Sequence, residues 1–380
     1  MPRRRICFVT GTRADFGLMN TALRAIRAHP RLSLQIVVTG MHLDRRRGRT
    51  ASRLRAEGWS IDAAVPWARS DTPAARTAAT GHAIARLAKV FGKLKPDVVL
   101  IVGDRVEALA AAVAGHLSDL VVAHVHGGDR ALGQADDALR HAITKLSHVH
   151  FAATPGSGQR LLDLGEDRWR VHVVGAPGID QVARAAAGRA CTRRLIGSDE
   201  PFALLIQHPT DPDPAIEFRR ADALIQGLLR SGIPRVAIID PNNDPGAEGI
   251  VQCWDQIDPA ERRVVRFDNL PRAEFLGLLR DTVVLVGNSS AGMIEAASFG
   301  TPVIDIGPRQ SGREHGPNVL HAACAAASVR KRIAGIWRKG APIRFPSRNL
   351  YGGAGTGRRI AQTLASLKVN SHVLRKLIAY

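Results

Sequence analysis

The chain of 380 residues has few cysteines and few aromatic residues, and it has no apolar run long enough to cross a membrane. A membrane-spanning helix needs about 20 consecutive apolar residues. The four cysteines are scattered without the spacing of metal ligands, so we expect free thiols, with Cys7 and Cys324 in apolar surroundings. Aromatic residues make up only 4% of the chain, too few for a surface that stacks nucleic-acid bases.

The beginning of the chain also lacks the apolar core and the cleavage site of a secretion signal. Residues 1–5 are basic and run directly into the strand-like residues 6–9. We therefore expect a cytoplasmic protein with no membrane partner.

Acidic residues are fewer than basic ones, and the net charge is +19. The basic residues are spread over the chain, with the densest runs at residues 45–47 and 330–332. No nucleic-acid-binding module accompanies them, so an arginine-rich composition explains the charge better than a nucleic-acid partner does. Such a field still attracts anionic substrates.

Apolar strands alternate with helices in the first half of the chain. At this length two domains are expected rather than one. Continuous apolar strands separated by helices predict a parallel sheet that is covered on both faces. The predicted strands are 5–9, 34–39, 98–102, 120–126, 149–152 and 171–174, and the predicted helices are 18–28, 46–57, 75–94, 106–116 and 136–148.

The same alternation begins again at residue 202, after a loosely patterned basic stretch that reads as a hinge. The predicted strands of this half are 202–206, 235–239, 264–267, 283–286 and 302–306. We predict an α/β fold with two Rossmann-like, doubly wound domains facing each other across a cleft. Their predicted bounds are 1–178 and 200–357, and the C-terminal segment 358–380 is a candidate to pack back on the first domain.

The turn at residues 287–296 is the most informative segment of the second half. Small residues, among them Asn288 and Gly292, allow a ligand to approach the backbone, and Ser289 and Ser290 lie where a new helix exposes unpaired N–H groups to an anion. Glu295, one turn further, can accept hydrogen bonds from sugar hydroxyls. A phosphate-bearing sugar or nucleotide fits this pattern. The alternative is an ordinary Asn/Ser-capped helix packed after a strand. In either case we expect the helix to continue to a stop at Gly300.

Carboxylates follow the predicted strands of the first half. Asp104, Asp129 and the pair Asp136–Asp137 lie at or just after strand ends. Neighbouring carboxylates in a partly dry cleft shift each other's pKa, which yields one acid and one base for proton abstraction at carbon. Helix capping is the alternative for Asp104 and for the Asp136–Asp137 pair, whereas Asp129 follows a Gly-Gly pair and is harder to explain in that way.

Basic side chains also lie at the turns. His208 follows a predicted strand and precedes a proline, so we expect it to face the cleft or to be a structural imidazole. Arg13, Arg309 and Arg313 are candidates to bind a diphosphate through bidentate contacts, with solvation at the surface as the alternative for Arg309. The histidines His124, His126 and His141 are spaced too irregularly to indicate a metal site, so no metal is expected.

Several of these motifs together resemble the UDP-N-acetylglucosamine 2-epimerases, in particular the hydrolysing branch that makes free N-acetylmannosamine. The resemblance runs in order along essentially the whole chain. It rests on residues 11–18, 126–129, 136–145, 287–292 and 307–313.

The resemblance implies a GT-B-like fold with the nucleotide held mainly by the second domain, a UDP-sugar substrate, no cofactor, and a homodimer or homotetramer. It assigns the diphosphate and ribose to Arg13, Ser289, Ser290 and Glu295. The implied catalytic carboxylates are Asp104, Asp129 and Asp137, and the implied reaction expels UDP to give a glycal that is then hydrated. His208 is an implied contact to the sugar or a phosphate.

This chain departs from the family pattern at several positions. Residues 12–15 and 208–211 differ from the Thr-Arg-Pro-Glu and His-Arg-Arg-Glu-Asn segments of non-hydrolysing relatives, which favours hydrolysis. Asp129 stands where the family has glutamate, and His315 stands where the branch often has arginine. The shorter Asp129 indicates a repositioned base, a different sugar or a slow enzyme, and His315 indicates an altered sugar or nucleotide.

Three alternatives therefore stay open from the sequence: a non-hydrolysing 2-epimerase, a GT-B glycosyltransferase and a non-catalytic nucleotide-sugar binder. The sugar substituents at C4 and C6 and the choice between UDP and GDP are also open.

Overall fold

The computed structural model describes residues 2–43, 50–67, 72–130, 137–241, 244–268, 270–338 and 340–379. Within them the chain divides into two compact units. The first unit holds the described residues up to 130, those from 137 to 180 and those from 351 onward, and the second unit runs from 181 to 350.

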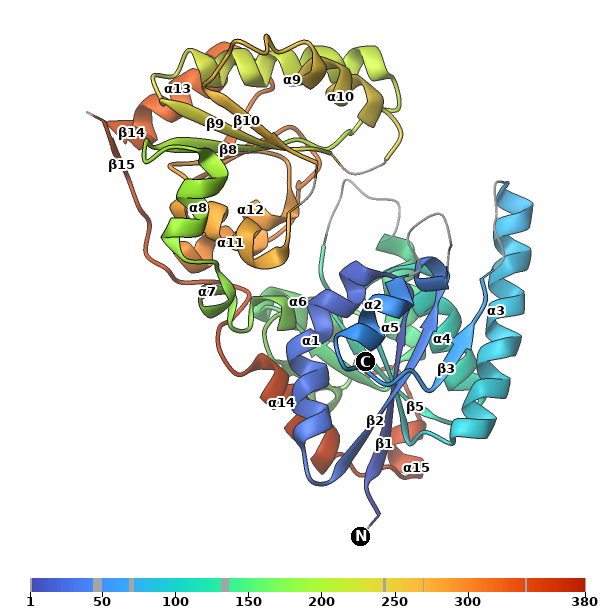
Figure 1. The fold of residues 1–380 in the computed structure, drawn as a ribbon. Coiled ribbons are helices and arrows are strands. Elements are labelled where there is room, and N and C mark those ends of the chain that lie inside the picture. The colour runs from blue at the N-terminus through green and yellow to red at the C-terminus, as the bar shows by residue number, and fades with distance from the viewer. Residues whose placement is uncertain are drawn as a thin grey trace. The chain divides into compact units, whose positions relative to one another are not determined.

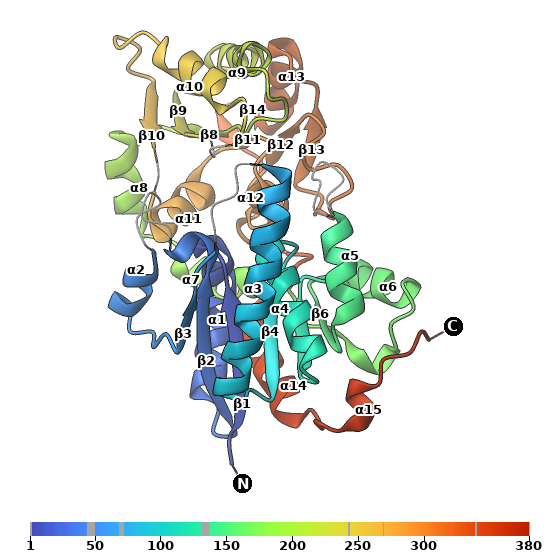
Figure 2. The same ribbon diagram turned by 90° about the vertical axis from the view of Figure 1, so that its right-hand side faces the viewer.

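The first unit is built on a parallel sheet of seven strands in the order β3-β2-β1-β4-β5-β6-β7 (Figures 1 and 2). This is the Rossmann strand order with one strand added, and it has a topological switch point between β1 and β4, where ligands bind in such folds. The strands are β1 (Arg4–Thr10), β2 (Leu32–Thr39), β3 (Ala63–Val65), β4 (Val98–Val102), β5 (Val121–Val125), β6 (Val149–Ala152) and β7 (Val171–Val173).

Helices cover both faces of this sheet because successive side chains of each buried strand point to opposite faces. Ile6 and Phe8 belong to the apolar core that includes residues of α1 and α14, whereas Cys7 and Val9 belong to the core on the other face, with α3 and α4. The helices are α1 (Arg13–Ala28), α2 (Thr50–Ala56), α3 (Pro73–Leu94), α4 (Val106–Leu117), α5 (Asp137–Leu146), α6 (Pro155–Asp163), α14 (Thr356–Ser366) and α15 (Ser371–Leu374).

The second unit repeats the Rossmann order in a parallel sheet of six strands, β10-β9-β8-β11-β12-β13. Helices α9 and α10 lie on one face of this sheet, and α8, α11 and α12 lie on the other (Figure 1). The elements are α7 (Val182–Ala185), α8 (Arg189–Ile196), β8 (Phe202–Ile206), α9 (Pro214–Leu229), β9 (Arg235–Ile239), α10 (Ala247–Asp255), β10 (Val264–Phe267), α11 (Arg272–Asp281), β11 (Leu285–Gly287), α12 (Ser290–Ile294), β12 (Val303–Ile306), β13 (Val319–Ala322), α13 (Ala326–Ile336) and a short hairpin, β14 (Trp337–Arg338) with β15 (Ala341–Pro342).

The predicted class, two Rossmann-like α/β domains, is confirmed, but some elements differ. The short strands β3 and β13, both at sheet edges, were not predicted from the sequence. The expected unbroken helix from the Ser289 turn to Gly300 is wrong, because α12 ends at Ile294 and a 3₁₀ turn, Ala296–Phe299, follows it. The stop at Gly300 is correct, and this glycine has a φ of +63°.

The C-terminal segment belongs to the first unit, where α14 packs along α1. Beyond α14, the buried Arg170 donates to the carbonyls of Val373 and Arg375 at 2.8 and 2.6 Å. Lys376 donates to Thr144 O, near the end of α5, at 2.6 Å.

The four cysteines are free: Cys7 and Cys253 are buried, and Cys191 and Cys324 are partly exposed. In the described part of the chain, no helix is long and apolar enough to cross a membrane.

Candidate active site

Asp104 lies at the carboxyl end of β4, beside the switch point of the first sheet. It does not cap α4, since the residue at the N-cap position is Arg105 and it makes no side-chain capping bond. Instead Asp104 forms an ion pair with Arg140 of α5, whose side chain is only 6% exposed. The buried guanidinium therefore has a carboxylate partner for its charge.

Arg140 links Asp104 to a second predicted carboxylate, Asp137, the first residue of α5. Its Nε lies 3.8 Å from Asp137 Oδ1, and His141 Nε2 lies 3.6 Å from Asp137 Oδ2. The spacing of three and four residues places both basic groups on the same face of the helix as Asp137. Asp136, the neighbouring predicted residue, lies outside the described part of the chain.

Asp129 is held by a tight turn after β5. Gly128 has a φ of +73°, and a Cβ there would lie 2.2 Å from Ser157 O, so only glycine allows this approach to α6. The turn brings Asp129 Oδ1 to 2.8 Å from Ser157 Oγ and Oδ2 to 2.7 Å from His126 Nδ1. Burial raises the pKa of Asp129, but His126, Arg140 and Ser157 outweigh burial, and the net direction is downward.

Five buried polar atoms at this edge have no hydrogen-bond partner within the described residues. They are His124 Nδ1, His126 Nε2, Asp137 Oδ1, Arg140 Nε and His141 Nδ1. Buried polar atoms are nearly always paired in folded proteins, so unpaired atoms at one strand edge indicate a ligand that completes the set. The sequence analysis missed Arg140, although its spacing of three residues from Asp137 signals the contact.

The three histidines considered as metal ligands contact different partners. His124 lies 2.7 Å from Gly103 O through Nε2, and burial lowers its pKa to about 3, so it is neutral. His126 contacts Asp129, and His141 contacts Asp137. Over the residues that the structure describes, no group of three histidine, cysteine or acidic side chains is placed to hold a metal ion.

An acidic residue that the sequence analysis missed, Glu107, lies near the end of β1. Glu107, buried on α4, forms an ion pair with Arg105 at 3.2 Å and packs against Gly11, where a Cβ would lie 2.8 Å from Glu107 Cγ. Burial raises the pKa of nearby Asp15 to about 6. Arg13 is the first residue of α1, and its side chain is exposed.

In the second unit, Asn288 fixes the two central strand ends at the switch point. Its side-chain Oδ1 accepts from His208 N at 2.7 Å, and its Nδ2 donates to His208 O at 2.8 Å. This pair of bonds joins the end of β11 to the end of β8 and sets the position of His208. Burial, with the charge of Arg309, lowers the pKa of His208 to about 4, so its imidazole is neutral.

The serines begin the short helix α12. Ser289 is its N-cap and accepts from Ala291 N at 3.4 Å, as the capping alternative predicts, and Ser290 is the first helical residue. Gly287 has a φ of +127°, and a Cβ there would lie 2.0 Å from Ile206 O. Gly292 packs so closely on β12 that a Cβ would lie 2.8 Å from Val303 Cγ1. Both glycines therefore bring the turn close to the sheet, leaving backbone rather than side chain near a ligand.

Glu295 is buried and forms an ion pair with Arg272 of α11. Burial raises its pKa, and Arg272 partly opposes that rise. Arg272 therefore lies beside the carboxylate that the family resemblance assigns to the ribose.

Two predicted arginines follow β12. Arg309 Nη1 and Gln310 Nε2 donate to Asn288 O at 3.2 and 2.9 Å, which ties this segment to the Ser289 turn. Burial lowers the pKa of Arg309, and the neighbouring charge of Arg313 contributes. Gln310 Oε1 and Arg313 Nε are buried without hydrogen-bond partners among the described residues. Arg309 and Arg313 place two cations close together, and Arg313 Nε is a donor still without a partner among these residues, which suits an anionic ligand such as a diphosphate.

His315, the second departure from the family pattern, belongs to a polar chain on the same segment. His321 Nδ1 lies 3.0 Å from the buried Asp305, and His321 Nε2 lies 3.2 Å from His315 Nε2. These contacts hold the segment that follows Arg313 against β12 and β13.

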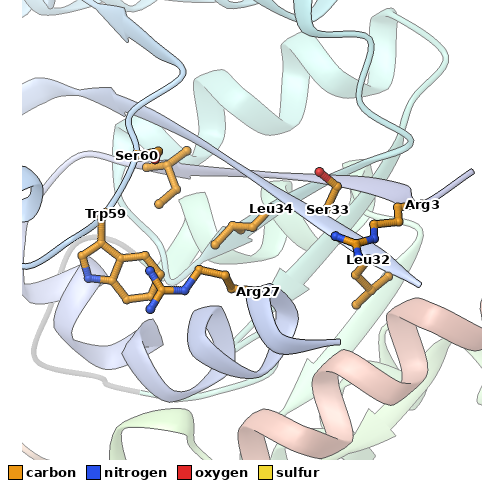
Figure 3. A pocket seen from close by; sticks show the side chains of 8 residues that line it. Arg3, Arg27, Leu32, Ser33, Leu34, Trp59 and Ser60 are labelled. Carbon is orange, nitrogen blue, oxygen red and sulfur yellow. The ribbon is translucent and has the colours of Figure 1, made fainter. Parts of the chain in front are cut away.

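A shallow pocket lies away from these residues, at the amino end of β2. Figure 3 shows Arg3, Arg27 and Trp59 around the start of this strand. The guanidinium of Arg27 lies 4.3 Å from the centre of the Trp59 ring. The candidate site lies at the other end of the strands, where their carboxyl ends are.

Comparison with known proteins agrees with this arrangement. The chain is 36% identical over 385 residues to UDP-N,N'-diacetylbacillosamine 2-epimerase (hydrolyzing) of Legionella pneumophila, covering 99% of this chain and all of that one. It is 35% identical to UDP-N-acetylglucosamine 2-epimerase of Neisseria meningitidis, covering 84% of this chain and 83% of that protein.

Solved structures of UDP-GlcNAc 2-epimerases share this fold. A crystal structure of UDP-GlcNAc 2-epimerase from Neisseria meningitidis bound to UDP-GlcNAc superimposes with a TM-score of 0.79 at 19% identity, covering 95% of this chain and 99% of that one. The predicted GT-B-like class is thereby confirmed. Residues 24–365 match the sequence model of UDP-N-acetylglucosamine 2-epimerase. The chain belongs to the UDP-N-acetylglucosamine 2-epimerase family and is a nucleotide-sugar 2-epimerase.

Proposed function

We propose that the chain is a hydrolysing epimerase, which converts a UDP-2-acetamido sugar and water into the free 2-epimeric sugar and UDP. The observation that carries this proposal is the set of carboxylates around Arg140, with unpaired polar atoms beside them at the carboxyl ends of β4 and β5. Relatives named as hydrolysing, from Legionella pneumophila and Campylobacter jejuni, support hydrolysis. The departures at residues 12–15 and 208–211 support it as well.

The proposed reaction has two stages. In the first, a base removes the proton from C2 while the C1–O bond breaks, the C–H electron pair forms the C1=C2 bond, and UDP leaves with the C–O pair. In the second, water supplies a hydroxyl to C1 and a proton returns to C2 on the opposite face. The sum is nucleotide sugar plus water giving free sugar plus UDP.

The first unit supplies the proton-transfer groups in this proposal. Asp104 is neutralised by Arg140 and suits a role in placing Arg140 and the sugar. Asp137 is one-third exposed and keeps Oδ1 without a hydrogen bond among the described residues, so it can accept or return a proton. Asp129, with its lowered pKa, remains a carboxylate near neutral pH.

The second unit holds the nucleotide in this proposal. Arg309 and Arg313 bind the diphosphate, the backbone of the Ser289–Ser290 turn adds N–H donors, and Glu295 accepts from the ribose. Asn288 and Gly292 shape the turn in this proposal, since both polar atoms of the Asn288 side chain bond to the backbone of His208.

A panel of nucleotide sugars followed by ³¹P and ¹H NMR tests the proposal. UDP-N-acetylglucosamine and UDP-N,N'-diacetylbacillosamine are expected to give UDP and a free sugar, one of them faster. Formation of UDP-N-acetylmannosamine without free UDP would contradict hydrolysis and support the non-hydrolysing alternative. Transfer to an added acceptor with C2 unchanged would support a glycosyltransferase.

Two finer predictions follow from the family resemblance. We propose a homodimer or homotetramer, which mass photometry of the purified protein tests. We also propose a cytoplasmic location, consistent with a UDP-sugar substrate, and cell fractionation tests it.

A further inference from the structure

The contacts of Asp129 raise a question about which group at this turn moves the proton. Both of its oxygens are engaged within the protein, Oδ1 by Ser157 and Oδ2 by His126. The adjacent imidazole, in contrast, has a nitrogen with no partner, His126 Nε2, buried within the described residues. The unpaired atom at this turn therefore belongs to the histidine and not to the carboxylate.

The hydrogen bonds fix where the protons lie. Ser157 Oγ receives hydrogen bonds from Thr154 at 2.9 Å and Arg160 at 3.1 Å, so its single proton is directed to Asp129. An ionised Asp129 can only accept, so His126 must carry its proton on Nδ1. With the Nδ1 proton held by Asp129, Nε2 is the ring nitrogen left to take up a proton, which is the arrangement that a general base requires.

The backbone at His126 is also unusual. Its φ is +68°, in the left-handed region that residues other than glycine seldom adopt. His126 N donates to Phe151 O at 3.1 Å, which ties this conformation to β6. Such strain is typical of functional sites, where the surrounding structure fixes a side chain in one orientation.

We propose that His126 is the base that takes the C2 proton, with Asp129 as its positioning residue. In that step the C2–H bond breaks and an Nε2–H bond forms, the C–H electron pair becomes the C1=C2 bond, and UDP leaves with the electron pair of the C1–O bond. Asp129 stabilises the resulting imidazolium through Nδ1–H. This proposal rests on the proposed function, and it gives Asp129, at a position where the family has glutamate, a positioning role.

The decisive variant is His126→Asn. Asparagine tolerates a positive φ and can donate to Asp129, but its carboxamide has no nitrogen that can take up a proton as Nε2 of histidine can. We expect kcat to fall about 10²- to 10⁴-fold with KM and the melting temperature close to those of the wild type. The pH profile of kcat/KM is expected to change as well. Asp129→Asn, which stabilises the wrong tautomer, is expected to lower kcat less than His126→Asn does.

Turnover of UDP-N-acetylglucosamine in D₂O separates the possible failures. Incorporation of deuterium at C2 by the wild type, and its loss in His126→Asn, support the proposal. An unchanged rate and pH profile in His126→Asn, with Asp129→Asn inactive, would overturn it and make Asp129 the base. Wild type that releases UDP without any C2 exchange would instead overturn the proposed function.

Discussion

The two units share one strand order but place very different chemistry at its switch point. In the first unit the strand ends carry carboxylates paired with a buried arginine and with histidines, as Asp104–Arg140 and Asp129–His126 show. In the second unit the corresponding ends carry glycines, the backbone bonds of Asn288, and Arg313, whose Nε has no hydrogen-bond partner in the part of the chain that the structure describes. The fold therefore supplies the location of each site, and the residues at the turns supply the chemistry.

The contrast also concerns what each edge can bind. Charges in the first unit compensate each other, which suits proton transfer to and from a neutral sugar. The second unit has excess positive charge near backbone N–H groups, which suits a diphosphate. Changes in the first unit should affect turnover, and changes in the second should affect nucleotide binding. The following variants test this division.

The largest effect is expected for Asp137→Asn in the first unit. Loss of this carboxylate removes Oδ1, an acceptor without a hydrogen bond among the described residues, so kcat should fall about 10²- to 10⁴-fold while the affinity for UDP stays within about twofold of the wild type. Initial rates and calorimetric titration with UDP measure the two quantities. Asp163→Asn is the matched control, because Asp163 of α6 contacts only Gln159 among the bonds described. A drop in UDP affinity equal to the drop in kcat would contradict the division of roles.

The opposite pattern is expected for Arg313→Met in the second unit. Loss of a charge-assisted contact to the diphosphate should weaken UDP binding about 10- to 150-fold, with kcat at saturating substrate nearly unchanged. The loss should be larger at low salt than at high salt. Arg330→Met, an exposed position on α13, is the control and should bind UDP as the wild type does. Equal UDP affinity in both variants would remove Arg313 from the nucleotide site.

Packing at the turn of the second unit is tested by Gly292→Ala. The new Cβ would lie 2.8 Å from Val303 Cγ1, so we expect a loss of about 1–3 kcal/mol of stability, together with weaker UDP binding. Gly335→Ala in the same unit meets no atom within 4 Å and is expected to be neutral or slightly stabilising. Denaturant unfolding compares the two variants, and equal stabilities would show that α12 can move away from β12.

A smaller difference between the units is expected on acidification. Burial lowers the pKa of His42 to about 4 and those of His124 and His148 to about 3 in the first unit, whereas His208 at about 4 is the corresponding histidine of the second. A histidine with a lowered pKa binds its proton in the unfolded chain first, so its contribution to stability is complete above pH 6.5. That contribution is lost as the pH falls toward 4 and then 3. Asp15, with a pKa raised to about 6, offsets part of this loss.

Hydrogen exchange followed by mass spectrometry at pH 7 and pH 5 tests this expectation. Peptides of β4 and β5 are expected to lose more protection than peptides of β8 and β11, by roughly 1–2 kcal/mol of opening free energy. Equal losses in the two sheets would contradict it.

The alternation of apolar strands and helices predicted much of this architecture from the sequence. Buried central strands such as 149–152 and 202–206 were predicted to the residue, since a short continuous apolar run is typical of a strand that is covered on both faces. The edge strands β3 and β13 were missed because they are short and only partly buried. The helix after Ser289 was predicted as unbroken because nothing in its composition marks the break at Glu295, which depends on tertiary contacts.

The candidate site shows a similar limit. Residue type and position at strand ends indicated Asp104, Asp129, Asp137 and Arg313. The pairing of Asp129 with His126 was not predicted, since it depends on the positive φ of His126 and on the approach of α6 through Gly128. Sequence spacing does not encode such an approach between elements.

The central claim is that this epimerase removes the C2 proton and releases UDP by adding water. The most direct test is incubation of the wild-type protein with UDP-N-acetylglucosamine in D₂O, followed by NMR of the sugar. The account predicts UDP and free N-acetylmannosamine carrying deuterium at C2. UDP released together with N-acetylglucosamine that keeps its original hydrogen at C2 would contradict it.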